Sequence, residues 1–215
     1  MRFLITAGPT REPIDPVRYI SNRSSGKMGY AIAEAAVEAG HQVVLVSGPV
    51  HLDPPNGAKL VSASTSDEMF EAVHRGVRHC DVLVMSAAVA DYKPARASGK
   101  KIKKSDQNLS LELIATRDIL LSLPKTDREY LVVGFAAETE NIRANALKKL
   151  REKNCDVVVA NDARIAMESD ENEITILFRD GKKREISRAP KKIIARELVK
   201  IFENVREKCL TKKIT

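Results

Sequence analysis

Short apolar runs alternate with amphipathic segments along the chain. The apolar runs stop at small or polar residues and predict strands at residues 2–8, 41–48, 59–63, 81–86, 130–135 and 156–160. Apolar residues at helical spacing predict helices at residues 29–40, 66–78 and 140–153. Strands that alternate with helices in this way predict a doubly wound, mostly parallel α/β sheet with helices on both faces.

Two stretches depart from that alternation. Residues 92–112 are polar and lysine-rich, and we expect them to form a flap. Residues 173–186 predict a β-hairpin that turns at Asp180-Gly181. We interpret this hairpin as a dimerisation element beyond a doubly wound core that ends near residue 165. An amphipathic helix over residues 191–208 completes a single domain that spans residues 1–215.

Composition narrows the class of protein. The 215 residues, 43% of them hydrophobic, suffice for one full core. No apolar run is long enough to cross a bilayer and the N-terminus lacks the pattern of a signal peptide, so we expect a soluble, cytoplasmic protein without membrane partners. The net charge of +7 favours anionic ligands, but only 4% of residues are aromatic and no recognition module is evident. Phosphorylated small molecules therefore fit better than nucleic acid, and three widely spaced cysteines indicate neither disulfides nor a zinc site.

The connection from the first strand to the first helix is unusually long and carries candidate phosphate ligands. It runs from Ala7 to Gly29 and ends in Ser24-Ser25-Gly26-Lys27-Met28-Gly29, where hydroxyls, an unhindered backbone and a lysine meet the start of the helix. That arrangement suits a phosphate, and the amide of Asn22 lies close by in sequence. The same residues also fit a glycine-rich turn with a serine cap. The loop matches neither the P-loop nor the dinucleotide fingerprint.

Small residues follow the strand at 81–86, in the sequence Ser86-Ala87-Ala88-Val89-Ala90-Asp91. Open α/β sheets bind ligands at the carboxyl ends of their strands, and small side chains there let a base or ribose approach the backbone. Asp91 could contact a ribose hydroxyl or a magnesium ion. Close packing of a helix against the alanines is the alternative explanation.

Several lysines are candidates for contacts with a triphosphate. A lysine from the run at residues 100–104 would stabilise charge that develops on an α-phosphate, although such a run is also typical of a solvated surface. Lys149 and Lys153 stand four residues apart and share one face of the predicted helix, which an ordinary surface helix also explains. Cys80 and Cys155 precede apolar strands, and we interpret them as packing residues.

Six blocks of sequence occur in an order that is specific to one family. They are residues 5–22, 24–29, 87–92, 101–104, 134–139 and 160–162. Together they resemble the phosphopantothenoylcysteine synthetase family over nearly the whole chain. No single block would be as specific as this dispersed match.

The resemblance implies a ligase of coenzyme A biosynthesis. In the implied reaction, 4′-phosphopantothenate attacks the α-phosphate of CTP to give an acyl-cytidylate and pyrophosphate, and the amine of L-cysteine then displaces CMP. CTP is thus the expected cosubstrate, magnesium is expected from the triphosphate chemistry, and flavin is not expected. The resemblance also implies a homodimer with shared active sites, for which the 173–186 hairpin is the candidate exchanged element.

Roles for individual residues follow from the same resemblance. Lys101 matches the family's catalytic lysine, and Asn22 matches the asparagine that holds the acyl intermediate. Phosphopantothenate or phosphate contacts are expected from Gly8, Asn22, Ser24, Ser25 and Gly26. Nucleotide contacts are expected from Met85, Ser86, Ala87, Asp91, Lys101, Arg117, Asp118, Ile119, Leu120, Phe135, Lys149 and Lys153. Asp91 is also the candidate magnesium contact, through the nucleotide.

Some points stay open at this level. The bacterial pattern commonly has Asn-Pro-Asp-Ile where this chain has Thr116-Arg117-Asp118-Ile119, and related enzymes differ between CTP and ATP. In many bacteria the synthetase is half of a bifunctional chain, so this sequence fits a free-standing enzyme or one half of a larger one. The alternatives from other classes are an NAD(P)-dependent reductase on the same fold and a non-catalytic basic binding protein.

Overall fold

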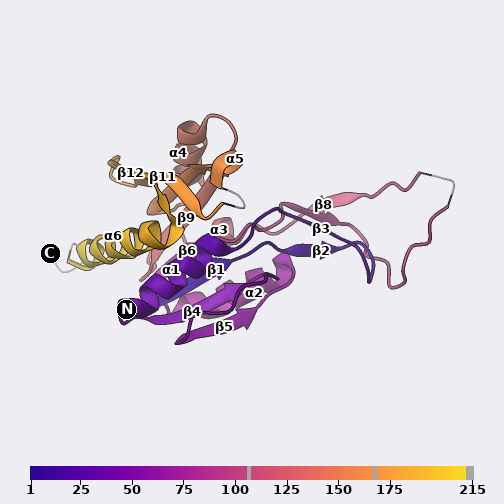
Figure 1. The fold of residues 1–215 in the computed structure, drawn as a ribbon, viewed down its shortest axis with the longest axis horizontal. Helices are drawn as coiled ribbons and strands as arrows, with labels where there is room; N and C mark the ends of the chain where they lie inside the picture. The colour runs from indigo at the N-terminus through magenta and orange to yellow at the C-terminus, as the bar shows by residue number, and fades with distance from the viewer. Residues whose placement is uncertain (106–107, 167–168, 212–215) are drawn as a thin grey trace.

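The computed structural model describes residues 1–105, 108–166 and 169–211. Its centre is an eight-stranded sheet with the strand order β12-β11-β10-β9-β6-β1-β4-β5 (Figure 1). In chain order these strands are β1 (Arg2–Ala7), β4 (Gln42–Ser47), β5 (Ala58–Ser62), β6 (Val82–Met85), β9 (Leu131–Glu138), β10 (Val157–Asp162), β11 (Glu171–Phe178) and β12 (Lys183–Pro190). The sheet agrees with the doubly wound architecture predicted from the sequence.

Six neighbouring strands of this sheet, β5-β4-β1-β6-β9-β10, are parallel and follow the order of a doubly wound nucleotide-binding sheet. Numbered along the chain within this sheet, their order across it is 3-2-1-4-5-6. The direction of winding reverses between β1 and β6, which lie side by side. Open α/β sheets bind ligands outside the carboxyl ends of the strands at such a reversal.

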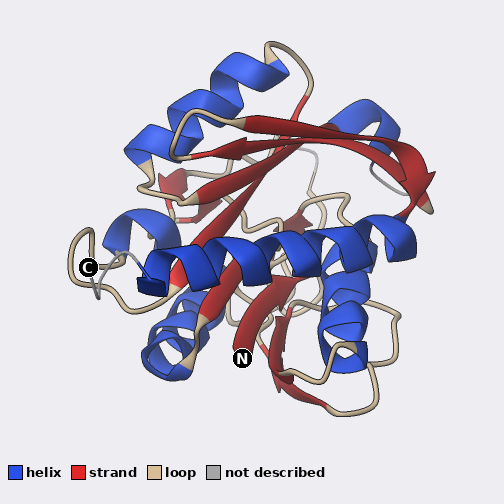
Figure 2. Ribbon diagram, turned by 90° about the vertical axis from the view of Figure 1, so that its left-hand side faces the viewer, coloured by secondary structure: helices blue, strands red, loops and turns tan. Residues whose placement is uncertain are grey.

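Helices cover both faces of the sheet (Figure 2). One face packs against α1 (Lys27–Glu38) and α6 (Lys191–Thr211), and the other against α2 (Ser66–Gly76), α3 (Ile119–Ser122) and α4 (Ile142–Glu152). Two short elements, η1 (Val77–His79) and α5 (Ala163–Ala166), complete the list of helices in the described chain. Because both faces are covered, the inner strands are buried on both sides and read in the sequence as continuous apolar runs.

Strand β1 and helix α2 illustrate how the sequence specifies these layers. Phe3 and Ile5 of β1 belong to the core under α1 and α6, whereas Leu4 belongs to the core under α2 and α4. Helix α2 begins with a capping box in which Thr65 accepts a hydrogen bond from the Glu68 amide and Glu68 accepts one from the Thr65 amide. These local signals are strong, and the elements they predict are the ones that form.

The predicted hairpin forms as β11 and β12, but it lies inside the core. Strand β11 pairs antiparallel with β10 and so extends the central sheet. Ile174, Ile176 and Ile186 are buried in the same cluster as the residues of α6. The parallel, doubly wound strands end with β10 at Asp162, and the hydrophobic core continues beyond them into β11, β12 and α6 because burying these isoleucines requires the sheet and the C-terminal helix together.

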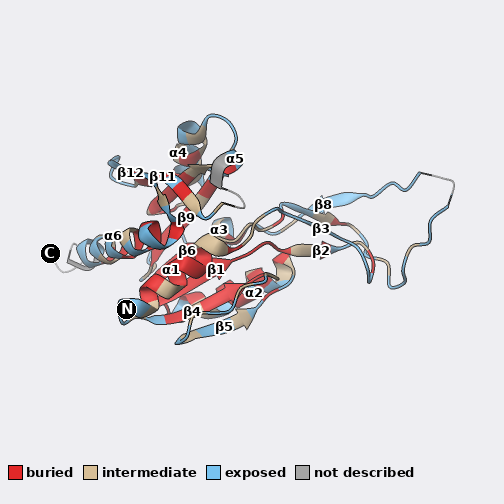
Figure 3. Cartoon of the chain, in the orientation of Figure 1, coloured by how far each residue is buried: buried red, intermediate tan, exposed pale blue. Residues whose placement is uncertain are grey.

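An arm projects from the edge of the sheet where the parallel strands end (Figure 1). Its regular parts are two antiparallel pairs, β2 (Arg11–Pro13) with β3 (Tyr19–Ser21) and β7 (Tyr92–Pro94) with β8 (Leu113–Ala115). The predicted flap lies within this arm. Most of it is exposed, in contrast with the sheet (Figure 3). Exposed apolar side chains on it are Val17, Tyr19, Tyr92, Leu109, Leu111, Leu113 and Ile114.

The helices of the described residues include none with the length and apolarity that a bilayer crossing requires.

Candidate active site

Two cavities adjoin at the carboxyl ends of the parallel strands. The acid-side cavity has a volume of about 360 Å³ and lies between the start of α1 and the ends of β6, β9 and β10. The nucleotide-side cavity, named for the contacts expected there, has about 230 Å³ and lies between the end of β6, α3 and α4. Both are lined by Ala87, Val89, Asp91 and Lys149. A ligand in one cavity can therefore meet a ligand in the other across the end of β6.

Backbone and hydroxyl hydrogen bonds hold the ends of β1 and β6 together beneath the cavities. The Ser86 hydroxyl donates to the Thr6 carbonyl at 2.7 Å, and the Ala87 amide donates to the Thr6 hydroxyl at 3.1 Å. The side-chain amide of Asn22 donates to the Ala88 carbonyl at 2.9 Å. Asn22 is thus fixed against the strand end at the wall of the acid-side cavity, where it was expected.

The start of α1 forms a cradle without negative charge. The N-cap residue Gly26 has φ +77°, a left-handed conformation that favours glycine, and no side chain caps the helix. No acidic residue lies in the first turn, so the helix dipole and unpaired amides favour an anion. Ser24, Ser25 and Gly26 line the acid-side cavity. The predicted phosphate ligands are therefore gathered at one place.

Glycines allow the close approach of α1 to the strands. A Cβ on Gly29 would lie 2.6 Å from both the Ala7 Cβ and the Ser86 Oγ, too close for any larger residue without a shift. Gly8, with φ +74°, lies directly behind Gly26 and lines neither cavity. Gly8 leaves room for the backbone of Gly26, which packs against it. The phosphate contact expected of Gly8 is therefore not a direct one in this structure.

The nucleotide-side cavity is lined by charged groups that are already partnered. Lys153 pairs with the carboxylate of Asp118, which also caps α3 by accepting from the Leu121 amide at 2.9 Å. Burial alone would raise the pKa of Asp118. The hydrogen bonds from Lys153 and Leu121 and the charges of the two lysines outweigh burial, so the pKa of Asp118 is lower than usual. Lys149 donates to the Phe135 carbonyl, and burial lowers the pKa of this lysine. These lysines are positioned by protein groups before any ligand binds.

Arg117, at the position where the bacterial pattern has proline, is anchored to α2. Its guanidinium carbon lies 3.8 Å from the centre of the Phe70 ring, and Nη1 lies 3.0 Å from the Glu71 carboxylate. A second, longer pair joins it to Asp67 at 3.4 Å. The loop that leads into α3 is thus held by contacts that a proline could not make.

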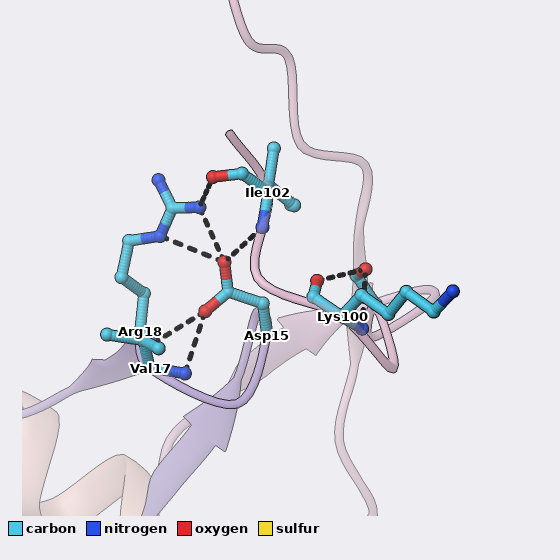
Figure 4. A network of polar contacts seen from close by, with 6 residues as sticks. Asp15, Val17, Arg18, Lys100 and Ile102 are labelled. Atoms are coloured by element: carbon cyan, nitrogen blue, oxygen red, sulfur yellow. Dashed lines mark hydrogen bonds and ion pairs between the residues drawn. The ribbon is translucent and has the colours of Figure 1, made fainter. Parts of the chain in front are cut away.

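Lys101 lies on the arm and lines neither cavity. Its neighbourhood is organised by Asp15, which accepts hydrogen bonds from the amides of Val17, Arg18 and Ile102 and from the Arg18 guanidinium (Figure 4). The Arg18 guanidinium also donates to the Ile102 carbonyl at 2.8 Å. The segment that carries Lys101 is therefore fastened to the arm, outside the cavities that the other expected nucleotide contacts line.

The cavities offer few carboxylates to a magnesium ion. No group of three or more His, Cys, Asp or Glu side chains suited to a metal occurs among residues 1–105, 108–166 and 169–211. Asp91 lies where the two cavities meet. A magnesium ion that is held mainly by phosphate oxygens needs only one or two protein carboxylates, so a single aspartate at this junction is compatible with it.

Most of the expected site residues line the cavities. The acid-side cavity has Asn22, Ser24, Ser25, Gly26, Ser86, Ala87, Asp91, Phe135 and Lys149. The nucleotide-side cavity has Met85, Ala87, Asp91, Arg117, Asp118, Ile119, Leu120, Lys149 and Lys153. Gly8 and Lys101 are the exceptions. The binding roles themselves stay predictions.

Four polar residues at one end of the acid-side cavity received no role from the sequence. They are Glu138, Asn161, Asn172 and Lys191. Glu138 and Asn161 stand at the ends of β9 and β10, so their position at a strand end was a usable signal. Asn172 and Lys191 come from β11 and the start of α6, which were expected outside the core, and no local pattern pointed to them.

Comparison with known proteins supplies the family. The sequence profile of the DNA/pantothenate metabolism flavoprotein C-terminal domain matches residues 1–205. The chain belongs to this family. Family membership confirms the relationship that the six sequence blocks indicated.

Named members of the family take part in coenzyme A biosynthesis. The coenzyme A biosynthesis bifunctional protein CoaBC of Bacillus subtilis is 49% identical over 187 residues, covering 85% of this chain and 46% of that protein. The Escherichia coli protein of the same name is 45% identical over 191 residues, covering 85% of this chain and 47% of that protein. The chain therefore spans about half the length of the curated relatives it matches.

Solved structures confirm the fold. A crystal structure of the C-terminal domain of CoaBC has a TM-score of 0.84 at 45% identity and covers 96% of each chain. A mutant of Cab2 in complex with phosphopantothenate-cysteine has a TM-score of 0.83 at 16% identity, covering 100% of this chain and 89% of that one. At that identity the second likeness shows the fold alone.

Proposed function

We propose that this chain is a phosphopantothenate–cysteine ligase that uses CTP and forms 4′-phosphopantothenoyl-L-cysteine through an acyl-cytidylate. The observation that carries the proposal is the pair of cavities that meet at Ala87, Val89, Asp91 and Lys149. One holds a nucleotide beside α3 and α4, and the other holds a phosphorylated acid beside the cradle of α1. The relatives named for coenzyme A biosynthesis support the same reaction.

The first half-reaction takes place where the cavities meet. The carboxylate of phosphopantothenate, held near Asn22, attacks the α-phosphorus of CTP, and the bond from that phosphorus to the bridging oxygen breaks. Pyrophosphate leaves with the electron pair. Lys101 stabilises the charge that builds up on the α-phosphate, a contribution on the order of 2 to 4 kcal/mol. The amides at the start of α1 and the hydroxyls of Ser24 and Ser25 hold phosphate oxygens.

Magnesium and the choice of CTP belong to the same proposal. Bound magnesium would neutralise phosphate charge, with Asp91 as the protein carboxylate nearest to its expected place. Lys149 and Lys153 are fixed by Phe135 and Asp118, so they present defined positive charges to the nucleotide. Discrimination of cytosine from adenine then depends on the shape and backbone groups of the nucleotide-side cavity.

We also propose a homodimer in which the arm, rather than the β11–β12 hairpin, reaches the other subunit. The arm carries the exposed apolar side chains that an interface would bury, such as Val17, Tyr19 and Tyr92. The outer strand β12 instead exposes Lys183, Arg184 and other polar residues, which protect a sheet edge from pairing. An arm that crosses to the partner would also bring Lys101 to a site that its own chain leaves without it.

The experiment combines purified protein, magnesium, 4′-phosphopantothenate, cysteine and either CTP or ATP, with each substrate omitted in turn. We expect pyrophosphate release that requires nucleotide and phosphopantothenate, and a product with the mass of the cysteine adduct. Faster release with CTP than with ATP supports the proposed nucleotide. Protection from thermal unfolding by NADPH but not by CTP, with no pyrophosphate release, would instead favour the reductase.

A further inference from the structure

One end of the acid-side cavity has no use in binding the nucleotide or phosphopantothenate. It is formed by Glu138 at the end of β9, Asn161 at the end of β10, Asn172 in β11 and Lys191 at the start of α6. The phosphate cradle lies at α1 and the nucleotide-side cavity beyond β6. The proposed reaction has a third substrate, an α-amino acid, that still needs a place.

Glu138 is a carboxylate that is held in place by hydrogen bonds, and its charge interacts with that of the nearby Lys149. Its Oε2 accepts a hydrogen bond from the Asn145 side chain at 2.9 Å, and Asn145 is itself held by the Glu140 carbonyl at 3.1 Å. The side chain is half-buried, and no ion pair joins it to another residue in the part of the chain that the structure describes. A carboxylate fixed in this way at a cavity wall can accept a proton or bind an ammonium group.

The other carboxylates near the cavities are engaged differently. Asp118 pairs with Lys153, and Asp162 pairs with Arg164 at 2.6 Å. Asp91 lies at the junction with the nucleotide-side cavity, where magnesium and ribose are expected. Two carboxylates, Asp91 and Glu138, line the acid-side cavity. Of these, Glu138 has no role toward the nucleotide in the proposed reaction, and it forms no ion pair with another described residue.

Neutral and positive groups complete this end of the cavity. Asn172 is 4% exposed, and its Oδ1 accepts from the Glu173 amide at 3.0 Å and from the Asn161 side chain at 3.5 Å. Those bonds engage the Asn172 oxygen as an acceptor, and the amide nitrogen is the donor group of this side chain. Lys191 is 7% exposed, lines the same cavity and donates to the Ser169 carbonyl at 2.6 Å, and its charge interacts with those of Lys27 and Asp170. A carboxylate and a cation separated by amides match a zwitterion.

We infer that this end of the acid-side cavity binds the cysteine substrate, with its ammonium at Glu138 and its carboxylate toward Lys191, and that Glu138 removes the proton that must leave before the amine can attack. The inference rests on the proposed ligase reaction and adds the site of its second half-reaction. Asn145 acts through Glu138 as a positioning residue.

In the proposed step, the amine of cysteine displaces CMP from the acyl-cytidylate. An ammonium has no lone pair, so one proton passes to the Glu138 carboxylate and frees the amine. The nitrogen then bonds to the carbonyl carbon of the acyl-cytidylate, and the bond from that carbon to the phosphate oxygen breaks. CMP leaves with the electron pair. The nitrogen loses its second proton to solvent as the amide forms, and Glu138 later returns its proton to solvent.

The test compares Glu138→Gln with the matched control Glu140→Gln, which makes the same change two residues away at an exposed position outside both cavities. Pyrophosphate release without cysteine reports the first half-reaction, and product formation with cysteine reports the second. We expect E138Q to release pyrophosphate with phosphopantothenate and nucleotide, and to lose roughly 10²-fold in kcat/KM for cysteine. E140Q should match the unmodified chain in both steps.

Hydroxylamine separates proton removal from general damage to the site. This small nucleophile is largely uncharged at neutral pH and needs no carboxylate to activate it, so it should trap the acyl-cytidylate equally well in E138Q and the unmodified chain. Glu138→Asp should recover part of the rate with cysteine. Equal loss with hydroxylamine and cysteine, or an unchanged kcat/KM for cysteine, would overturn the inference. If the unmodified chain releases no pyrophosphate, the ligase proposal itself fails, which is a distinct result.

Discussion

The sheet edge and the arm differ in what they contribute to the proposed active site. At the sheet edge, hydrogen bonds join the ends of β1 and β6, and Gly29 lets α1 approach them closely. The arm exposes apolar side chains, and the segment around Lys101 is held by the buried carboxylate of Asp15 and by the Arg18 guanidinium. The sheet edge forms both cavities by itself, whereas the arm carries a predicted catalytic residue away from them.

This difference indicates which parts of the site a single chain can complete. The proposed binding of the nucleotide and the phosphorylated acid depends on packing within the doubly wound core. The proposed charge stabilisation by Lys101 depends on where the arm docks, which a single chain leaves open. Changes at the sheet edge should therefore affect stability and binding together, and changes on the arm should affect turnover with little effect on the core.

Lys101→Gln should have the largest effect on turnover. Loss of the positive charge at the α-phosphate should lower the rate of pyrophosphate release by roughly 10²- to 10³-fold, while thermal stability stays unchanged. Lys100→Gln, an exposed neighbour on the same arm, is the control and should keep most of the activity. Normal pyrophosphate release by K101Q would remove Lys101 from the mechanism.

A mixed dimer sharpens the same comparison. Co-purified chains that carry K101Q and N22A should regain part of the activity if Lys101 acts in the partner's site, because one of the two sites then has both residues intact. If the arm serves its own chain, each site lacks one residue and the mixture stays inactive. Measuring the mass of the unmodified protein at micromolar concentration tests the dimer directly.

Gly29→Ala tests the close packing at the sheet edge. The added Cβ would lie 2.6 Å from the Ala7 Cβ and the Ser86 Oγ, so α1 or the strand ends must shift. We expect a loss of about 1 to 3 kcal/mol in the free energy of unfolding and weaker nucleotide binding. Gly99→Ala, on the arm, meets nothing within 4 Å and should be neutral in thermal unfolding. Equal stability of the two variants would contradict the comparison between the two regions.

The sequence predicted the elements that are specified locally. Inner strands such as β1 and β6 are buried on both faces, so their apolar runs identify them, and the capping box of Thr65 and Glu68 marks the start of α2. The strands β2 and β3 were missed, since their three-residue pairing forms within a proline-rich loop. The β11–β12 hairpin was predicted, but its pairing with β10 depends on distant residues and was not.

The residues of the candidate site also fall into those that the local sequence places and those that only distant contacts place. Residues at strand ends, such as Ser86 and Asp91, could be placed at the sheet edge because parallel strands bring their carboxyl ends together. Asn172 and Lys191 reach the cavity only because β11 and α6 fold back onto it, which no local pattern reveals. The position of Lys101 away from the cavities follows from the arm's own hydrogen bonds to Asp15, which are equally non-local.

Asp15→Asn tests how the arm holds its shape. The bond from Arg18 keeps the pKa of the Asp15 carboxyl well below its usual range, although burial opposes this, and the amides of Val17, Ile102 and Arg18 add to it. D15N should speed hydrogen exchange at the Ile102 amide and lower turnover, with little change in the core. Exchange at core amides of β1 is the internal control, and equal acceleration there would argue against an independent arm.

The pH dependence of that effect has a defined sign. Because the pKa of Asp15 is depressed in the folded chain, the carboxylate's contribution is complete above the ordinary aspartate pKa of about 3.9 and declines as the pH falls below it. The difference between D15N and the unmodified chain should therefore be constant from pH 7 to pH 5 and should narrow in more acidic solution. Thermal unfolding of the two proteins at each pH, followed by a signal that reports on the arm alone, measures this difference in stability.

The smallest effect is expected for Arg117→Ala, at the point where arm, sheet edge and α2 meet. Arg117 is about half exposed, so its pairs with Glu71 and Asp67 and its contact with Phe70 contribute on the order of 1 kcal/mol together. Loosening the loop before α3 should raise the KM for the nucleotide a few-fold and leave kcat unchanged, because Asp118 and Lys153 keep their pairing. Arg75→Ala, an exposed arginine of α2 outside both cavities, is the control. A large fall in kcat with an unchanged KM would mean that Arg117 acts on the reacting phosphate rather than on the loop. In that case the sheet edge, and not only the arm, would supply catalytic charge.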